Sequence, residues 1–434
     1  MSKHRPLRDA LRFIRGNNLV FALTDLLGNF ARGMVTPYAS LYILALGGNT
    51  TKIGLVNSIR PLAGLIMFPI GGYIADHARR ARLVVLGSCL SAAIVLMYTL
   101  APSWQVLAVA ALLQGFVVFQ LPARSALIAD SLLPEDRGRG IAAQNAISWG
   151  LTILAPYIGG VVVESYGSEV GPRALYWVVL LAYVLAAVIQ VRFLRETTAH
   201  TGNERRLTLS DLGGVLRDAY RGIPSLLGRL PRSLRALAVA VILSHVATSV
   251  LGPFWVLYAM DHVGLSLSEW GVILLVELVL KSAMFVPAGM LVDRWGRTAS
   301  ALTALLISLA CTLLFVFAQS FAAVLLIRIG IAVAYAIGLP ACSALMADIV
   351  PRDIRGRVMA ALGHGGLKIG VTGGGVGGPS VGYVATLPLM AASLAGGYLY
   401  AWAPVSPWFC AAIATALSVG LISLFVRDPK QAER

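Results

Sequence analysis

Six ionisable residues stand inside long apolar stretches of the chain, and their chemistry has to be explained first: Asp25, Arg32, Arg60, Arg124, Glu277 and Lys281. An ionised side chain near the centre of a lipid-embedded helix costs roughly 3 kcal/mol. We therefore expect all six to face protein or water rather than lipid. In that setting a carboxylate can exchange a proton, and a guanidinium can bind an anionic group.

The first apolar stretch carries a polar stripe. Asp25, Asn29, Arg32 and Thr36 follow one another at helical spacing, which places them within about 60° of one another around a helix. We expect this stripe to line a cavity that contains at least Arg32. The alternative is that Asp25 and Arg32 only bond to neighbouring helices, since intramembrane polar residues also hold helices together.

Glu277 and Lys281 stand four residues apart with the acid first, which is the favoured order for an ion pair on a helix. They form either a self-neutralising pair or part of a proton-coupling site. His245 could titrate near neutral pH, although a lone histidine among small residues is more often simply hydrogen-bonded.

The composition requires a membrane protein. The 434 residues are 58% hydrophobic and 13% charged, with a mean hydropathy of +0.78, whereas a soluble protein carries about 25% charged residues. Apolar stretches of 18 or more residues recur along the chain, and each is long enough to cross the bilayer as a helix. The polarity does not alternate as in a membrane barrel.

The predicted fold class is therefore all-α integral membrane, with twelve transmembrane helices in two pseudo-symmetric six-helix bundles. The predicted spans lie near 18–46, 53–75, 83–101, 106–129, 141–164, 174–194, 234–260, 267–292, 299–319, 322–347, 380–403 and 408–426. The corresponding parts are a cytoplasmic N-terminal segment (1–17), an N-terminal bundle (18–195), a cytoplasmic linker (196–232), a C-terminal bundle (233–427) and a cytoplasmic tail (428–434).

The formal net charge of +15 is topological rather than a sign of nucleic-acid binding. Most Lys and Arg residues lie in the termini and in alternate loops, as the positive-inside rule predicts for a multi-pass protein of the cytoplasmic membrane with both termini in the cytoplasm. Within the basic linker, Leu207 to Leu230 has apolar residues at helical spacing, which suits a helix lying on the anionic lipid surface. A plain linker is the alternative.

The two halves repeat each other. Leu121–Asp130 (LPARSALIAD) recurs as Leu339–Asp348 (LPACSALMAD), and both lead into a turn that contains Arg-Gly-Arg. Gly72 and Asp76 before Arg80 likewise recur in the second half. A duplicated six-helix bundle is typical of secondary carriers.

The pattern Gly-x-x-x-Asp-(Arg)-x-Gly-Arg after the second and eighth spans resembles the signature of the major facilitator superfamily, and the resemblance extends over essentially the whole chain. The first copy departs from it at His77 and Arg79. By this resemblance the motif acts as a conformational latch, in which the Asp faces a helix N-terminus across the domain interface and the Arg pairs with an acid at the end of span four or ten. The latch residues would be Gly72, Asp76, Arg80 and Asp130 in the first half, and Gly289, Asp293, Arg297 and Asp348 in the second.

The resemblance also implies that spans one, four, seven and ten line a central cavity. The expected lining comprises Asp25, Asn29, Arg32, Thr36, Gln120, Arg124, Ser244, His245, Thr248, Trp255 and Tyr335. The glycine-rich stretch from Gly363 to Gly382 is expected to be a flexible cytoplasmic loop before span eleven. No nucleotide-binding loop, metal site or cofactor is expected, because the glycines lack the Gly-Lys-Ser/Thr pattern and the cysteines stand singly in apolar stretches.

These features predict a monomeric secondary transporter that moves a small solute by alternating access, driven by a solute or ion gradient. The aromatic lining favours export of amphipathic compounds, whereas Arg32, Arg60 and Arg124 favour an organic anion. The candidates for proton coupling are Asp25, Glu277 and Lys281, although two antiporter patterns of the family match only in part. A membrane-embedded enzyme or a sensor is the less supported alternative, because the histidines are scattered.

Overall fold

The computed structural model describes residues 15–197, 209–221, 228, 230–350, 358, 366–373 and 383–427. These residues form helices and irregular segments and contain no strand, so the predicted all-α class is confirmed. The first half contains α2 (Gly16–Val35), η1 (Thr36–Tyr38), α3 (Ala39–Ala45), α4 (Thr50–His77), α5 (Arg80–Thr99), α6 (Trp104–Phe116), η2 (Val117–Phe119), α7 (Gln120–Asp130), α8 (Arg137–Gly150), η3 (Leu151–Leu154) and α9 (Ala155–Phe193). After α10 (Leu209–Arg221), the second half contains α12 (Arg232–Leu251), α13 (Trp255–Asp261), α14 (Leu267–Trp295), α15 (Arg297–Phe315), α16 (Phe321–Ile349), α18 (Tyr383–Trp402) and α19 (Ser406–Phe425).

Ten helices among the described residues are long and apolar enough to cross a membrane. One of them, Arg137–Phe193, has 57 residues and is long enough to cross twice, because a single crossing takes about 20 residues. It breaks at Gly167, where φ is 82°, a conformation that glycine adopts without a steric penalty. The predicted first span is a helix broken at η1. The count of twelve crossings stays a prediction.

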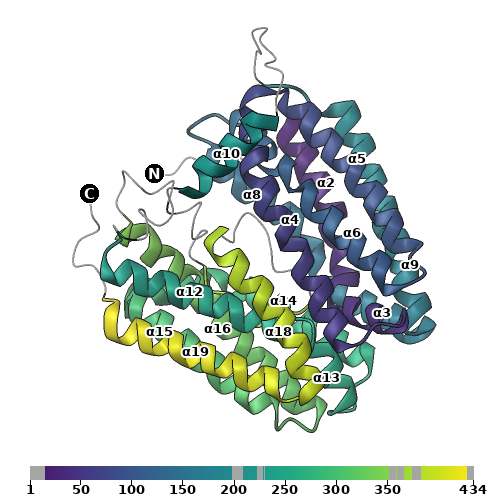
Figure 1. The fold of residues 1–434 in the computed structure, drawn as a ribbon. Helices are drawn as coiled ribbons and strands as arrows, with labels where there is room; N and C mark the ends of the chain where they lie inside the picture. Colours follow the sequence, from purple (N-terminus) through teal and green to yellow (C-terminus); the bar gives the residue numbers. More distant parts are fainter. Residues whose placement is uncertain are drawn as a thin grey trace, which may run out of the picture.

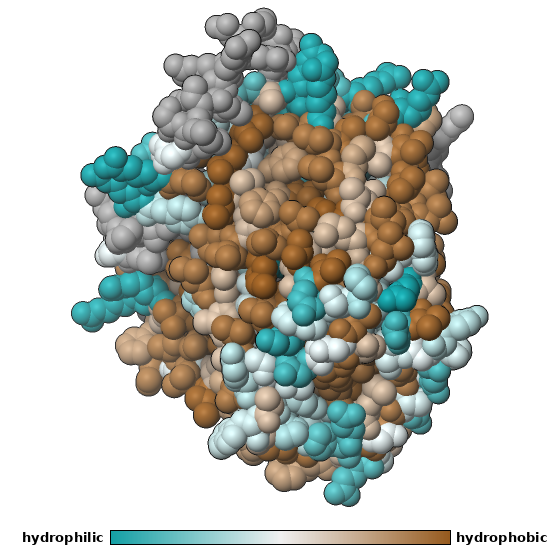
Figure 2. Space-filling model, turned by 45° about the vertical axis from the view of Figure 1, so that its right-hand side comes forward, coloured by the Kyte–Doolittle hydropathy of each residue, from teal (hydrophilic) through white to brown (hydrophobic). Residues whose placement is uncertain are grey.

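The surface of the protein is suited to lipid. Large apolar side chains stand outward on several helices, including Val286, Phe317 and Leu424, whose exposed fractions are 71%, 72% and 72%. Figure 2 shows brown, apolar residues over a broad band of one face, with teal, hydrophilic residues mostly toward its upper and lower parts. An apolar surface of this extent is far larger than water-soluble monomers expose. This is a multi-pass membrane protein.

The helices pack as two bundles that meet at one end (Figure 1). The contacts between the bundles run between α9 and α14 and between α4 and α18. The backbone N–H of Ser268 donates to Glu164 Oε2 at 2.7 Å, and Ser40 Oγ donates to the carbonyl of Pro253 at 2.7 Å. These bonds lie where α3 and α13 come together, and we call this the closed end. In Figure 1 the bundles diverge from it toward α10.

Residues Leu209–Arg221 of the linker form helix α10, which lies against α4. The expected placement of this helix on the lipid surface stays a prediction. Its Tyr220 hydroxyl donates to the carbonyl of Leu65 at 2.5 Å. That carbonyl has no helical donor, because the residue four positions later is Pro69, which lacks a backbone N–H. Tyr220 therefore supplies the hydrogen bond that proline removes from α4.

Candidate functional site

A cavity of about 290 Å³ lies inside the N-terminal bundle, between α2, α4, α5, α9 and the helix formed by α6, η2 and α7. Of the predicted lining residues, this cavity brings together Asp25, Asn29, Arg32, Gln120 and Arg124. The polar stripe of the first span thus faces space inside the protein.

Asp25 and Arg124 form an ion pair across this cavity, and both side chains are partly exposed to it. Gln144 Nε2 also approaches Asp25 Oδ2, at 3.4 Å, and the Arg124 guanidinium lies 5.0 Å from the centre of the Phe21 ring. The aspartate therefore has one charged and one neutral donor. The Asp25 carboxylate thus contacts both a cation and the cavity.

Arg32 donates to Asn29 Oδ1 at 2.7 Å, and Asn29 donates in turn to the carbonyl of Ser148 at 3.2 Å. Arg60 also lines the cavity. Among the described residues, no carboxylate lies within ion-pair distance of Arg32 or Arg60. With Arg124 paired to Asp25, the lining holds two positive charges that have no acidic partner in the part of the chain that the structure describes.

A second cavity of about 130 Å³ adjoins the first and shares Arg32, Arg60, Gln114 and Tyr183 with it. Thr36, which completes the polar stripe, lies here with further tyrosines. The Tyr98 and Tyr176 rings are stacked with their centroids 5.2 Å apart. The two cavities together combine guanidinium groups with aromatic rings.

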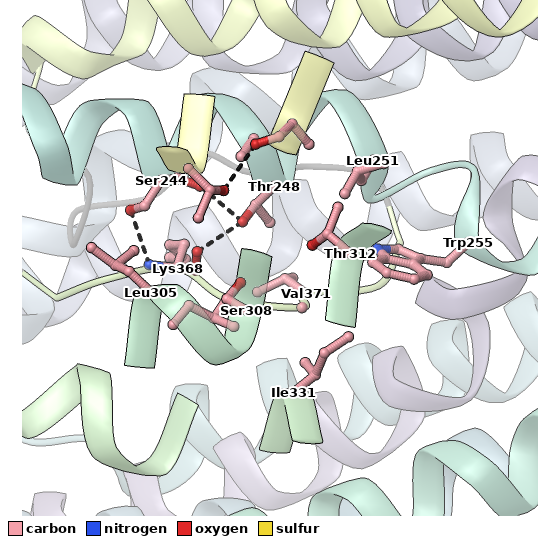
Figure 3. A pocket seen from close by; sticks show the side chains of 15 residues that line it. Ser244, Thr248, Leu251, Trp255, Leu305, Ser308, Thr312, Ile331, Lys368 and Val371 are labelled. Atoms are coloured by element: carbon pink, nitrogen blue, oxygen red, sulfur yellow. Dashed lines mark hydrogen bonds between the residues drawn. The ribbon is translucent and has the colours of Figure 1, made fainter. Parts of the chain in front are cut away.

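The predicted lining residues of the C-terminal half lie elsewhere. Ser244, Thr248 and Trp255 line a cavity of about 20 Å³ inside the C-terminal bundle (Figure 3), which is room for about one water molecule. His245 is buried and hydrogen-bonded to the carbonyl of Val241 at 2.8 Å, and Tyr335 packs against Lys281. In the part of the chain that the structure describes, the two sets of predicted residues thus line separate cavities, and their shared lining of one central cavity stays a prediction.

Glu277 and Lys281 form the ion pair that their spacing predicts, but a third charged residue joins it. Lys281 Nζ lies 2.5 Å from Glu277 Oε1, but Arg328 Nε donates to the other oxygen at 2.6 Å. Glu277 and Arg328 are 2% and 1% exposed, and the Arg328 guanidinium lies over the Trp255 ring at 4.8 Å. One carboxylate thus faces two cations. The count of six interior charges missed Arg328, although it stands seven residues into the tenth predicted span.

The glycine-rich stretch is not a loop outside the bundle in the part that the structure describes. Residues 366–373 run as irregular backbone among α12, α15, α16 and α19 and line the small cavity. Leu367 and Ile369 are buried. The rest of the expected loop, from Gly363 to Gly382, lies outside the described residues. Periodicity could not reveal this placement, because glycine runs carry no apolar pattern.

The arginines expected in the latch contact the expected acids. Arg80 lies 2.7 Å from Asp130, and Arg297 forms an ion pair with Asp348. Asp76 and Asp293 are exposed, and neither has an ion-pair partner among the described residues. Among the described residues, a Cβ on Gly72 or Gly289 would meet no atom within 4 Å apart from its chain neighbours and the backbone of its own helix. The role of these residues as a latch stays a prediction.

Comparison with known proteins identifies the family. The model of the Major Facilitator Superfamily matches residues 21–231 and 237–434. The chain belongs to the Major Facilitator Superfamily. Its members are transporters, so this protein is a transporter of small molecules rather than an enzyme, and the resemblance seen in the sequence is confirmed.

Among proteins of the superfamily, the chain is 27% identical over 340 residues to the multidrug resistance protein MdtG of Enterobacter lignolyticus (strain SCF1), covering 76% of this chain and 77% of that protein. Its fold resembles the crystal structure of a bacterial homolog of the human lysosomal transporter Spinster in an inward-facing, occupied conformation, with a TM-score of 0.68, 16% identity and coverage of 98% and 99%. It also resembles the human organic anion transporter MFSD10, with a TM-score of 0.63, 17% identity and coverage of 96% and 100%.

Proposed function

We propose that this transporter is a secondary carrier that exports small amphipathic compounds across the cytoplasmic membrane by alternating access. The observation that carries the proposal is the pair of adjoining cavities in the N-terminal bundle, where the guanidinium groups of Arg32 and Arg60 lie beside Tyr98, Tyr176 and Tyr183. Aromatic walls with a few polar groups suit a ligand that has an apolar body and one polar end. The similarity to a multidrug resistance protein supports export.

The second candidate is transport of an organic anion. It is favoured by Arg32 and Arg60, which have no acidic partner within ion-pair distance among the described residues. A carboxylate or sulfonate can accept two parallel hydrogen bonds from one guanidinium. An anion bound here would also compensate the excess positive charge of the lining.

Asp25 is the strongest candidate for proton coupling. It contacts the cavity, whereas Glu277 is 2% exposed and is held between two cations. Protonation of Asp25 would release Arg124, and an unpaired Arg124 would be free to bind substrate. Replacing Asp25 with Asn should therefore allow substrate exchange while abolishing the movement of protons that accompanies net transport, as read by a pH-sensitive dye inside proteoliposomes.

The arrangement of the bundles supports alternating access with the cavity open on the side opposite the closed end. The larger cavity is lined by Thr24, in the middle of α2, and by Gln190, near the divergent end of α9. Helices α4 and α14 begin near the closed end, so the basic turns that follow them, around Arg80 and Arg297, lie at the divergent end. The positive-inside rule assigns such an end to the cytoplasm. We propose that both termini are cytoplasmic and that the monomer is the functional unit.

Counterflow in proteoliposomes tests the function, because a carrier exchanges labelled for unlabelled solute and a channel or sensor does not. Two probes separate the candidates: tetraphenylphosphonium as an amphipathic cation and 1-naphthalenesulfonate as an amphipathic anion. Arg32→Gln should reduce anion exchange at least about tenfold, the loss expected for a charged hydrogen bond of about 1.5–3 kcal/mol, and should spare exchange of the cation. Arg192→Gln, on the exposed end of α9, is the matched control and should change neither.

A further inference from the structure

Residues 366–373 cross the interior of the C-terminal bundle as irregular backbone. Backbone of this kind is tolerated at membrane depth only where protein or water satisfies its polar groups. Ser308 and Thr312 of α15, Ile331 of α16 and Thr415 of α19 line the same small cavity as the segment. The segment is therefore an inserted element of the bundle, packed between its helices.

Helix α12 and Arg328 satisfy the backbone of this segment. Thr248 Oγ1 donates to the carbonyl of Lys368 at 3.0 Å, and the Lys368 N–H donates to Ser244 Oγ at 3.3 Å. The bonds to Lys368 are visible in Figure 3. Arg328 Nη2 donates to the carbonyl of Gly370 at 3.0 Å. The segment thus covers the polar face of α12 that would otherwise line a cavity.

The segment also reaches the other bundle. The Gly373 N–H donates to the carbonyl of Gly252 at 2.8 Å, and a Cβ on Gly373 would lie 2.5 Å from the carbonyl oxygen of Thr36. Gly370 and Gly373 have φ of 61° and 86°, which other residues adopt only with strain. The path of the segment therefore depends on glycine at both positions.

The positive charge of Arg328 is only partly compensated in this arrangement. Arg328 shares Glu277 with Lys281, so the three groups carry one net positive charge. Arg328 Nη1 is buried and has no hydrogen-bond partner among the described residues. The carbonyl of Gly370 is neutral, and a hydrogen bond to an anionic oxygen is roughly twice as strong. An anionic oxygen in its place would bind Arg328 and would also compensate the excess charge.

We propose that residues 366–373 occupy the C-terminal half of the transport site in place of the substrate, and that a substrate with an anionic oxygen displaces them to bind Arg328, Ser244 and Thr248. This rests on the proposed function, because it requires a transported solute. It narrows the substrate class to amphipathic anions such as carboxylates or sulfonates. Displacement also removes the contact of Gly373 with Thr36, which gives substrate binding a direct effect on the packing between the bundles.

Maleimide labelling of Val371→Cys tests the displacement in purified full-length protein whose four native cysteines are replaced by alanine. Val371 lines the small cavity, and none of the hydrogen bonds described above for the segment uses its backbone. Saturating 1-naphthalenesulfonate should raise the labelling rate at least about fivefold, and tetraphenylphosphonium should leave it unchanged. Gly373→Ala should raise the rate without any probe. Gly420→Ala is the matched control, since a Cβ there meets nothing within 4 Å.

The labelling and the counterflow of the same anion separate the two proposals. Increased labelling together with counterflow supports both the displacement of residues 366–373 and the proposed transport. Increased labelling without counterflow supports displacement and removes the transport proposal. Unchanged labelling with counterflow overturns displacement and leaves transport intact, while a loss of both signals overturns both. The labelling of Val371→Cys with and without 1-naphthalenesulfonate keeps Gly373 in place. A folding defect of Gly373→Ala would therefore not affect the test of displacement.

Discussion

At the scale of single residues, the buried charges of the C-terminal bundle are the most consequential feature. Glu277 is 2% exposed and forms ion pairs with both Lys281 and Arg328. Removing one partner from a buried ion pair is more costly than the pair is worth, because the remaining charge is left without compensation in a medium that solvates it poorly. Removing the Glu277 carboxylate would leave two buried cations, Lys281 and Arg328, without their ion-pair partner.

Glu277→Gln should therefore lower the free energy of unfolding by about 3–5 kcal/mol, measured as the change in the denaturation midpoint in detergent. Replacing Arg328 with Met in the same chain should recover part of this loss, since only Lys281 then lacks an acidic partner. Glu135→Gln, in an exposed turn, should be neutral. A Glu277→Gln protein as stable as the wild type would contradict the charge assignment.

At the scale of elements, the docking of α10 depends on a backbone hydrogen bond that is missing in α4. Pro69 leaves the carbonyl of Leu65 without its helical donor, and the Tyr220 hydroxyl replaces that donor. The linker helix is thus tied to a specific turn of the first bundle by a polar contact as well as by packing.

Tyr220→Phe should free α10 from α4 at a cost of about 1 kcal/mol, and limited proteolysis of the linker should become about fivefold faster. In a Pro69→Ala background the same substitution should have a smaller effect, because the alanine restores a backbone N–H that the carbonyl of Leu65 can accept. Equal effects in the two backgrounds would mean that the hydroxyl does not act through this carbonyl. The double-mutant cycle isolates the interaction from changes in folding.

At the scale of the whole molecule, the closed end holds the bundles together through few polar contacts. The Glu164 carboxylate accepts from the backbone N–H of Ser268, and Ser40 donates to the carbonyl of Pro253. Contacts of this size are comparable to the differences in free energy between the states of a transporter, so single substitutions can shift the populations.

Glu164→Ala should weaken the closed end and shift the population toward separation there by at least about tenfold, since a hydrogen bond to a charged group contributes about 1.5–3 kcal/mol. Ser168 and Gln319 are both exposed near this end. Spin labels at these two positions would report the shift as a longer label-to-label distance in double electron–electron resonance. Glu169→Ala, which removes only an exposed pair with Arg173 on the same helix, is the control. An unchanged distance distribution would show that the contact between Glu164 and Ser268 does not hold the closed end together.

The sequence by itself determined the membrane class, the duplicated halves and the polar stripe of the first span. These follow from apolar run length and helical spacing, which are local properties. The resemblance to the superfamily also implied which arginine pairs with which aspartate, and both Arg80–Asp130 and Arg297–Asp348 are present.

Only the tertiary structure decided which charges share a partner and where irregular backbone lies. Arg328 joins Glu277 from a different helix, 51 residues away, and residues 366–373 enter the bundle because Ser244, Thr248 and Arg328 satisfy their backbone. Neither placement has a local signal, since a glycine-rich segment takes its path from the donors and acceptors that surround it. Long-range hydrogen bonding therefore sets the path of residues 366–373, which helical periodicity could not predict.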